Sequence, residues 1–449
     1  MSGTIIDVAA PAEDAPEREE TPRAEGARRL YAVVWRWHFY AGLLTAPLMW
    51  VVTLTGALYA FRTEIVEWRD RPWLVVEPGP QRKGLDELIE VAKKAGGSDE
   101  LEGMALRPEP DRSVRFMVEG TGTGGHDGGP PHVDVYVNPY TGDVLGTRTE
   151  GTDVFDVVLA LHRNLMYGST GRALVELTTA WGLILLATGV YLWWPRGKTN
   201  VGVWTPRLKG KLYAVLRDWH SVPGFYLAAL IGIVTATGLV FSLVMGSTFN
   251  WSVQKIGHWP PAWMAPPKAA PAPPGASAAP LDVVAANFLK EARPGEVVAF
   301  RPAAKPELNH RAWISEDDDK NRMRAVTADR WTGEVISSVA PADLPFMYRV
   351  RLWSVSTHVG KIFGLTTEIL ACVASLAMFA LSATGVWMWW ERRPRNRTGF
   401  PRRPEPKSLP RWGWLIVVVG GVLLPVAGAS MVLVVLLDAL AYPLRKRWA

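Results

Sequence analysis

The stretch "WRWHFYAGLLTAPLMWVVTLTGALYAF" (residues 35–61) decides the fold, because it is long and apolar enough to cross a bilayer but carries a histidine near its start. The same design returns 182 residues later as "RDWHSVPGFYLAALIGIVTATGLVFS" (217–242). His38 and His220 each open a W-H-x3-G pattern that leads into T-x-T-G. The shared residues are Gly42, Thr53, Thr55 and Gly56 in the first copy and Gly224, Thr235, Thr237 and Gly238 in the second. The pattern indicates a duplicated membrane unit.

Four apolar runs reach the length of about 20 residues that a helix needs to span a bilayer. A fifth run, Leu415–Leu437, is interrupted by Gly420, Gly421 and Pro425, so whether it crosses fully stays open. The chain of 449 residues is therefore predicted to be an α-helical integral membrane protein with a C-terminal hydrophobic helix. The four clear runs are Phe39–Phe61, Ala173–Trp194, Pro223–Val244 and Ile369–Trp390.

Lysine and arginine are distributed unevenly along the chain. Segments 195–219 and 391–411 together hold 14 basic and 3 acidic residues, whereas segment 62–161 holds 11 basic and 19 acidic residues. The positive-inside rule places the N-terminus and the short loops in the cytoplasm and both long loops outside. The net charge of +6 then reflects topology, and nucleic-acid binding is not supported. The first 27 residues lack the apolar region of a cleavable signal, so the first span is expected to be the anchor.

A second repeat, with an offset of 196 residues, joins the remaining two spans. His162 and His358 are followed at equal distances by glycine, then by Thr-Gly, and then by the double tryptophans at 193–194 and 389–390, which are expected to form an aromatic belt. The long loops also match. "LDELIEVAKKAG" (85–96) and "LDVVAANFLKEA" (281–292) have helical apolar spacing, and strand-like runs with a turn follow each. A small α+β domain is expected in each loop.

The predicted architecture is two copies of span, outer domain and span, followed by a tail. A Pro/Ala-rich linker at 260–280 precedes the second outer domain. The predicted segments are an N-terminal tail 1–35, first span 36–61, first outer domain 62–160, histidine segment and second span 161–196, cytoplasmic loop 197–219, third span 220–246, linker and second outer domain 247–345, histidine segment and fourth span 346–391, basic loop 392–411, and hydrophobic helix and tail 412–449.

Four histidines at duplicated positions favour a ligand role over that of isolated interfacial residues. Ionisable residues at membrane depth are costly and are usually functional, and neutral imidazole is a preferred ligand of haem iron. The duplication predicts His38 with His220 on the cytoplasmic side and His162 with His358 on the outer side. Each pair would hold one six-coordinate haem b, so two haems per chain are expected, forming a four-helix haem-binding bundle. The single cysteine, Cys372, excludes c-type haem and internal disulfides.

The duplicated glycines share a helix face with the histidines, because 18 residues separate each histidine from its second glycine and make five helical turns. We expect Gly42, Gly56, Gly224 and Gly238 to leave room for a macrocycle; the alternative is that they serve helix packing alone. Basic residues near the histidines are candidates for pairing with haem propionates. They are Arg36, Arg163, Arg217 and Lys361.

Several other residues are expected to lie outside this chemistry. Glu176 and Glu368, which open two spans, are expected at the interface, with a proton-handling role open. "GTGTGG" (120–125) lacks the helix of a dinucleotide fingerprint, so a hairpin loop is expected there. His126 and His132 beside it could bind a metal, although the loop interpretation is favoured. We expect the two histidines without repeat counterparts, His258 and His310, at the surface.

These residues together resemble a known family. The W-H-x3-G spans, the T-G-x-x-x-W-W span ends and the Y-T-G-D-V-L-G hairpin resemble the PepSY-associated transmembrane family of bacterial iron-regulated inner-membrane proteins, over roughly residues 30–440. The resemblance implies two small PepSY-like periplasmic domains, and haem ligands at His38, His162, His220 and His358. It departs in "VSTHVGKIFG", which lacks the basic residue that follows the histidine in "LHRNLMYG".

Because family members include ferrisiderophore reductases, the resemblance implies a membrane oxidoreductase of the bacterial inner membrane that reduces a periplasmic ferric siderophore. The chain shows no flavin or nicotinamide motif, so quinol or a cytoplasmic partner would donate the electrons. Two alternatives stay open. One is a non-redox PepSY-domain protein that binds or regulates a periplasmic partner, and the other is a metal-ion permease that uses the histidines as a relay.

Overall fold

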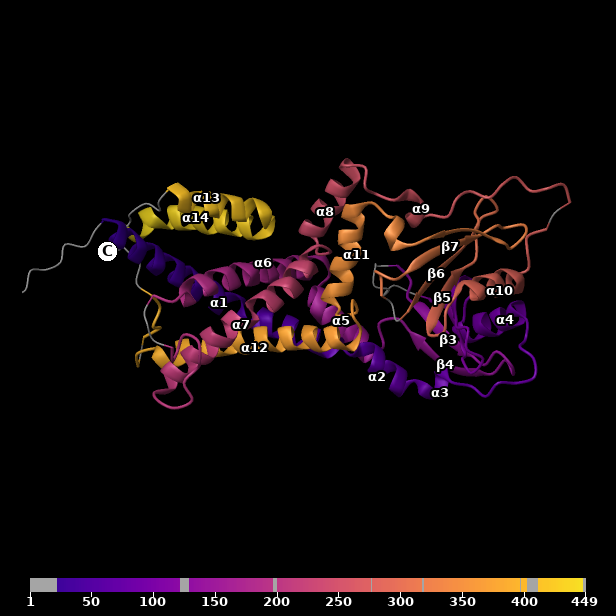
Figure 1. The fold of residues 1–449 in the computed structure, drawn as a ribbon, viewed down its shortest axis with the longest axis horizontal. Coiled ribbons are helices and arrows are strands. Elements are labelled where there is room, and N and C mark those ends of the chain that lie inside the picture. The colour runs from indigo at the N-terminus through magenta and orange to yellow at the C-terminus, as the bar shows by residue number, and fades with distance from the viewer. Residues whose placement is uncertain are drawn as a thin grey trace, which may run out of the picture.

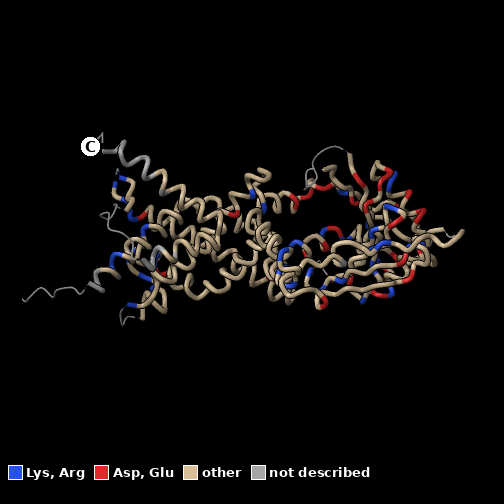
Figure 2. Tube along the Cα trace, turned by 90° about the horizontal axis from the view of Figure 1, so that it is seen from above, with Lys and Arg blue, Asp and Glu red and all other residues tan. Residues whose placement is uncertain are grey.

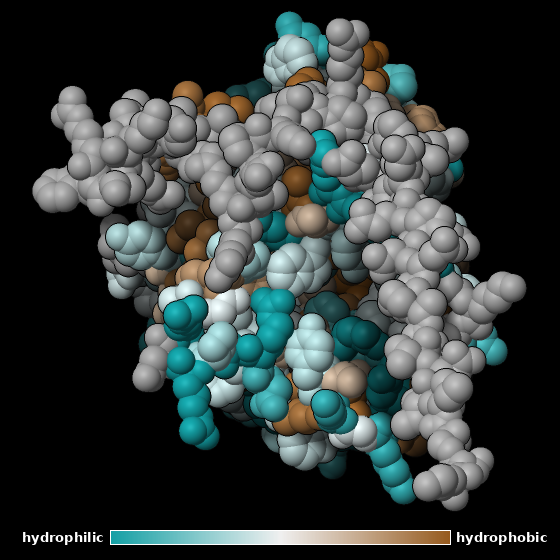
Figure 3. Space-filling model, turned by 90° about the vertical axis from the view of Figure 1, so that its left-hand side faces the viewer, coloured by the Kyte–Doolittle hydropathy of each residue, from teal (hydrophilic) through white to brown (hydrophobic). Residues whose placement is uncertain are grey.

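The computed structural model describes residues 22–121, 129–196, 200–275, 277–316, 319–395, 397–401 and 411–446. It consists of a long helical bundle with a large antiparallel sheet at one end (Figure 1). Charged residues gather over the sheet and at the far end of the bundle, and few lie between (Figure 2). On the end face away from the sheet, hydrophilic residues lie among hydrophobic ones (Figure 3).

Four helices are long and apolar enough to cross a membrane, and each covers most of one predicted run; the largest difference is in the third, where the helix ends at Leu239, five residues before the predicted end at Val244. They form a closed ring in which each helix packs on two neighbours, in the order α1–α6–α7–α12. Helices α1 and α7 therefore face each other across the bundle, as do α6 and α12. The bounds are α1 Pro22–Tyr59, α6 Gly168–Trp193, α7 Leu212–Leu239 and α12 Leu365–Arg392.

Short helices join the bundle to the sheet, and two of them carry histidines. Helix α5 (Val154–Asn164) ends at a turn where Leu165 and Met166 adopt left-handed φ angles of 53° and 57°. Helix α11 (Phe346–His358) ends just before Gly360, at φ 79°. The expected histidine segments are thus separate helices, broken from α6 and α12 by these turns. The other connecting elements are α2 Arg62–Arg69, α3 Arg71–Leu74, α8 Val244–Lys255, α9 Pro261–Met264 and η1 Pro341–Asp343.

The two expected α+β units share one continuous sheet of eight strands, in the order β4-β3-β2-β1-β5-β6-β7-β8. The units join through antiparallel pairing of β1 with β5, where Ala105 lies opposite Ala299. Joining them in this way satisfies the edge strand that each unit would otherwise expose. The bounds are β1 Leu101–Leu106, β2 Val114–Glu119, β3 His132–Val137, β4 Val144–Thr149, β5 Glu296–Arg301, β6 His310–Glu316, β7 Arg324–Ala328 and β8 Val335–Val339.

The sheet has one apolar face and one polar face, because successive side chains of a strand point to opposite sides. Helices α4 (Leu85–Gly96) and α10 (Leu281–Glu291) cover the apolar face, where Phe116, Phe300 and Phe288 are fully buried. The alternate side chains of the same strands line a cavity between the sheet and the helices α2, α5 and α11. The fold thus turns its polar sheet face towards the bundle.

The fifth apolar run is not one helix. It forms a hairpin of α13 (Arg411–Leu423) and α14 (Pro425–Lys446), and the two helices lie side by side along α6 (Figure 1). The break falls at Pro425, where a backbone donor is missing, and Gly421 and Gly428 meet closely across the turn. Trp181 Nε1 of α6 donates to Ser430 Oγ of α14 at 3.1 Å. The hairpin returns the end of α14 to the end of the bundle away from the sheet, which corrects the prediction of a single C-terminal hydrophobic helix.

Candidate functional site

The four histidines lie as two facing pairs inside the bundle. The ring centroids of His38 and His220 are 6.3 Å apart, and those of His162 and His358 are 6.0 Å apart. Each pair takes one residue from each copy of the repeat. His38 and His220 face each other from α1 and α7, while His162 and His358 come from the ends of α5 and α11.

Hydrogen bonds at Nδ1 fix which ring nitrogen each histidine offers. Nδ1 of His162, His220 and His358 lies 2.8–2.9 Å from a backbone carbonyl oxygen, of Val52, Leu381 and Val234 respectively. Because a carbonyl oxygen only accepts, Nδ1 carries the proton in these three residues.

His38 reaches the same state through a hydroxyl group. Its Nδ1 lies 2.9 Å from Thr188 Oγ1, which donates its own proton to the carbonyl of Ile184. All four neutral imidazoles therefore keep Nε2 as the free nitrogen, which is the state of a metal ligand oriented by its surroundings.

The separation within each pair matches a single metal atom placed between two imidazoles. Two metal–nitrogen bonds of about 2 Å, plus about 1 Å from each nitrogen to its ring centre, give about 6 Å. The two pairs also have a regular spacing. His38 precedes Val52 by 14 residues, and His220 precedes Val234 by 14 residues, so the pairs lie about 20 Å apart along α1 and α7.

The duplicated glycines divide between two roles. A Cβ at Gly56 would lie 2.9 Å from Cε1 of His162, and one at Gly238 would lie 2.7 Å from Cε1 of His358. These glycines make room for the imidazoles of the sheet-side pair. Gly42 and Gly224 have Leu185 and Leu381 as their nearest neighbours, and both line the cavity that opens beside His38 and His220, where the prediction placed open space.

Two glycines that were not singled out from the sequence lie beside the other pair. A Cβ at Gly189 would lie 3.4 Å from His38 Cε1, and one at Gly385 would lie 3.5 Å from His220 Cε1. They belong to the Thr-Gly steps that the repeat places at equal positions, so the repeat itself was the available signal. Each histidine of the bundle thus lies against a glycine of a neighbouring helix.

A cavity of about 690 Å³ opens beside His38 and His220 at the end of the bundle away from the sheet. Its aromatic wall includes Trp193 and Trp389, the first member of each double tryptophan, while Trp194 and Trp390 are largely exposed. Trp193 Nε1 donates to the carbonyl of Val203, so this tryptophan packs on a loop instead of belonging to a simple belt. The cavity is also lined by arginines, namely Arg196, Arg207, Arg217 and Arg392.

Of the four predicted basic partners, only Arg217 lines this cavity. It bonds to the fully buried carboxylate of Asp218, which also holds Arg207. Arg36 lies over the ring of Tyr40, and Arg163 is exposed on α5. Arg217 was predicted because it lies close to His220 in the sequence. The other three arginines of the cavity, Arg196, Arg207 and Arg392, lie farther from the histidines in the sequence and were not predicted.

The fourth predicted basic residue, Lys361, lies at the sheet side in an ion pair. Its Nζ is 2.8 Å from Glu368 Oε1 and 3.4 Å from Glu64 Oε1. Glu368 is 2% exposed, and so is Glu176, whose carboxylate accepts the backbone N–H groups of Val244 and Met245 at the start of α8. Both glutamates are buried in the protein, near the sheet-side ends of α6 and α12.

Between the two histidine pairs the bundle is filled with apolar side chains. Met49, Ile231 and Met378 are buried there, and the methyl groups of both methionines pack against Gly182. The buried threonines nearby, such as Thr45 and Thr53, donate to carbonyls of their own helix. The stretches of the four helices between the pairs, residues 39–55, 177–187, 221–237 and 369–384, contain no Asp, Glu, Lys, Arg or His.

The chamber between the sheet and the bundle has a volume of about 910 Å³. Its floor includes Leu159 of α5 and Val355 of α11. Each precedes a histidine of the sheet-side pair by three residues, which is about one helical turn or 5 Å. The chamber therefore ends one turn from His162 and His358, at equal points of the two repeats.

The remaining histidines lie in neither pair. His132 lines the chamber, with Nδ1 3.0 Å from Glu150 Oε2. His310 is 4% exposed in the sheet, where burial and the nearby Arg330 lower its pKa to about 4, so the expectation of a surface position was wrong for this residue. His258 is half-buried. His126 lies outside the described residues, as does most of the "GTGTGG" loop.

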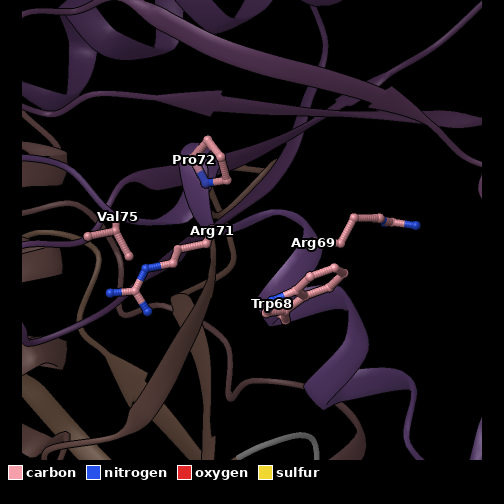
Figure 4. A pocket seen from close by; sticks show the side chains of 5 residues that line it. All are labelled: Trp68, Arg69, Arg71, Pro72 and Val75. Carbon is pink, nitrogen blue, oxygen red and sulfur yellow. The ribbon is translucent and has the colours of Figure 1, made fainter.

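A further recess, of about 630 Å³, lies on α2 and α3 beside Trp68 and Arg71 (Figure 4). Arg69 at its edge is held by Asp70 at 2.8 Å and by Asp153 at 2.6 Å. Trp68 is 80% exposed, so the recess is an open surface feature without a histidine among its lining residues.

Four membrane-length apolar helices that carry a large extramembrane sheet define a membrane protein. Residues 35–392 match the model of the PepSY-associated TM region, and the chain belongs to this family. The matched part contains all four paired histidines and the whole sheet. No curated protein matches the chain.

Proposed function

We propose that this protein is a haem-b transmembrane electron-transfer protein that reduces ferric chelates on the sheet side of the membrane. The observation that carries the proposal is the pair of facing histidine sites, each with Nε2 free and about 6 Å between ring centres. Haem iron held between two imidazoles passes single electrons and has no open position for oxygen. The proposal places two haems in each chain.

The surroundings of the histidines support this assignment. Nδ1–H bonds to carbonyl and hydroxyl groups orient each ring, as is usual for histidines that ligate metals. At the end away from the sheet, Arg196, Arg217 and Arg392 line the adjoining cavity, where guanidinium groups would pair with propionates.

The apolar centre of the bundle favours electron transfer over ion transport. A metal-ion permease needs polar or ionisable groups along its path, because a bare ion in hydrocarbon is very costly. Met49, Ile231 and Met378 instead fill the space between the two pairs. Electrons cross such a packed apolar layer without a hydrated path, so the relay of an ion through the histidines is the weaker alternative.

The chamber supports an acceptor site on the sheet side. A ferric chelate in the chamber would lie next to Leu159 and Val355, one helical turn from the nearer histidine pair. One electron converts Fe(III) to Fe(II), which hard oxygen ligands hold less strongly, so the chelate releases its iron. The proposal includes a bacterial inner-membrane location, a periplasmic sheet, ferric siderophores as substrates, and quinol or a cytoplasmic protein as the electron donor.

A non-redox PepSY protein is the second candidate. The polar chamber alone would serve such a protein, which binds a partner under the sheet without needing the histidines. Paired imidazoles with fixed tautomers have no role in that alternative.

Measurement of bound haem separates these functions. The purified full chain should be red, with a dithionite-sensitive b-type spectrum and two haems per chain in a pyridine haemochrome assay. His258→Ala, which alters neither pair, should keep both haems. A colourless protein with correct folding would leave the non-redox function as the better one.

A further inference from the structure

The chamber under the sheet has an unusual charge for its location. Segment 62–161 carries 19 acidic and 11 basic residues, so the first outer unit is acidic as a whole. The chamber is lined instead by eight Lys and Arg side chains and five Asp and Glu side chains. The fold therefore concentrates cations from both units on the face that looks towards the bundle.

The lining carboxylates are already engaged. Each accepts a hydrogen bond or forms an ion pair within the outer part of the protein. The contacts are Glu67 with Arg107, Asp134 with Arg115, Glu150 with His132, Asp153 with Arg69, and Asp156 with the backbone N–H groups of Gly151 and Asp153.

Among the described residues, five of the eight lining cations form no ion pair with a carboxylate: Arg62, Arg112, Arg301, Lys320 and Arg351. Arg301 lies at the end of β5, on the sheet side of the chamber, and is exposed. Arg62 lies at the start of α2, on the opposite side of the chamber from the sheet, with its guanidinium over the ring of Tyr59. These two arginines approach the chamber from opposite sides. Apolar side chains complete the wall, among them Met117 and Trp313.

We propose that the chamber selects ferric chelates that carry a net negative charge over neutral or cationic ones. This inference rests on the proposed function, because it assigns the charge class of the acceptor. The volume of about 910 Å³ lies within the range of about 300–1,000 Å³ found for small-molecule sites. The unpaired cations supply the charges, Arg62 and Arg301 from opposite sides, and the neighbouring Trp313 and Met117 supply apolar contact.

The test uses one chelator scaffold with three charges. A linear trihydroxamate is loaded with Ga(III), which has the charge of Fe(III) but is not reduced under these conditions. Its pendant amine is left free, acetylated or succinylated, which gives a cation, a neutral complex and an anion. Binding to the haem-loaded full chain in detergent is measured by calorimetry at low and high salt.

The anion should bind about tenfold more tightly than the cation at low salt, and salt should reduce this ratio because the interacting charges are partly exposed. Arg62→Gln combined with Arg301→Gln should weaken the preference. Lys94→Gln combined with Lys290→Gln removes the same charge from the helix-covered side of the sheet and should leave the preference unchanged.

Equal affinity for the three complexes would overturn the inference, as would a preference for the cation or a preference that the loss of Arg62 and Arg301 leaves unchanged. Absence of binding by all three complexes would remove the chelate site from the chamber. None of these results affects the haem assignment, because redox-inert Ga(III) reports on binding alone. Conversely, a purified chain without haem would contradict the proposed function, and the binding series would still measure the charge preference of the chamber.

Discussion

The two ends of the bundle carry the same residue types in different settings. At the end away from the sheet, His38 and His220 lie within long helices, next to an arginine-lined cavity of about 690 Å³. At the sheet end, His162 and His358 lie on separate short helices, and their rings press against Gly56 and Gly238. One site has space and charge around it, and the other is closely packed.

The difference shows how one duplicated pattern serves two tasks. The arginine-lined cavity beside His38 and His220 suits a bound group whose negatively charged edge lies near water. The packed pair takes its orientation from the carbonyls of Val52 and Val234, which no side-chain change removes. The sheet-side pair is therefore more sensitive to added volume, whereas His38 at the opposite end is more sensitive to the loss of a single side chain, that of Thr188.

The largest effect is expected from removing one histidine at each end. His358→Ala should abolish ferric-chelate reduction driven by the native donor, because the sheet-side iron loses an axial ligand. The other haem should keep its spectrum and still accept electrons from the donor. In His220→Ala the sheet-side haem should persist and be reducible by dithionite, but not by the donor.

Optical spectra, haem content and turnover of the two variants measure this difference. Full reductase activity in His358→Ala would contradict the proposed order of electron transfer. Loss of both haems in each variant would show that the ends are not independent sites.

Added volume at the glycines should have the next largest effect. Gly238→Ala places a methyl group 2.7 Å from His358, so the ring must shift, and overpacking of this kind costs about 1–3 kcal/mol. The sheet-side haem should be lost or altered, while the other haem is retained. Gly232→Ala in the same helix is the matched control, because nothing lies within 4 Å of an added Cβ there. Equal spectra for Gly238→Ala and Gly232→Ala would refute the tight packing of this pair.

Loss of a hydroxyl group should distinguish the ends more subtly. Thr188→Val removes the Nδ1 partner of His38 and should shift the potential of that haem by on the order of 40 mV, equivalent to a hydrogen bond of about 1 kcal/mol. Thr55→Val should have little effect, because His162 keeps the carbonyl of Val52 at 2.8 Å. Redox titration of both haems tests the contrast, which fails if Thr55→Val produces the larger shift.

The smallest effect concerns how the two histidine helices begin. Asp153 caps α5 by accepting the N–H of Phe155, whereas α11 begins after Pro345 without a side-chain cap. Burial tends to raise the pKa of Asp153, but hydrogen bonds from Arg69 and Phe155 outweigh it and lower the pKa. The stabilisation is therefore complete above the unfolded pKa of about 3.9 and is lost as pH falls through the lower folded value.

Asp153→Asn keeps a capping side chain but removes the charge that pairs with Arg69 and Arg148, and it should lower the stability of the folded protein by about 1 kcal/mol or less at pH 7. The difference between the variant and the unmodified protein should shrink below about pH 4, where the carboxyl group becomes protonated. Thermal unfolding at both pH values measures it. A difference that is constant with pH would show that the charge of Asp153 does not contribute.

Local patterns explain why much of the candidate site was predictable. A span is recognisable because apolar length is a property of consecutive residues, and the repeat predicted which histidines face each other across the bundle. Arg36 and Arg163 were misplaced because proximity in sequence to a histidine does not determine where a long side chain lies. The same limit hid Arg196 and Arg392, which loops and helix ends bring to the cavity.

The sequence by itself determined the four spans, the duplication and the two histidine pairs, because hydrophobic length and residue spacing act along a single helix. Tertiary structure alone decided the joined eight-stranded sheet, the charge of the chamber and the C-terminal hairpin. These features depend on pairing between residues up to about 200 positions apart, as in Ala105 opposite Ala299, and on which face of each strand meets the bundle. Burial and hydrogen bonding in the assembled fold determine these three features, and the spacing of residues along one helix or strand does not encode them.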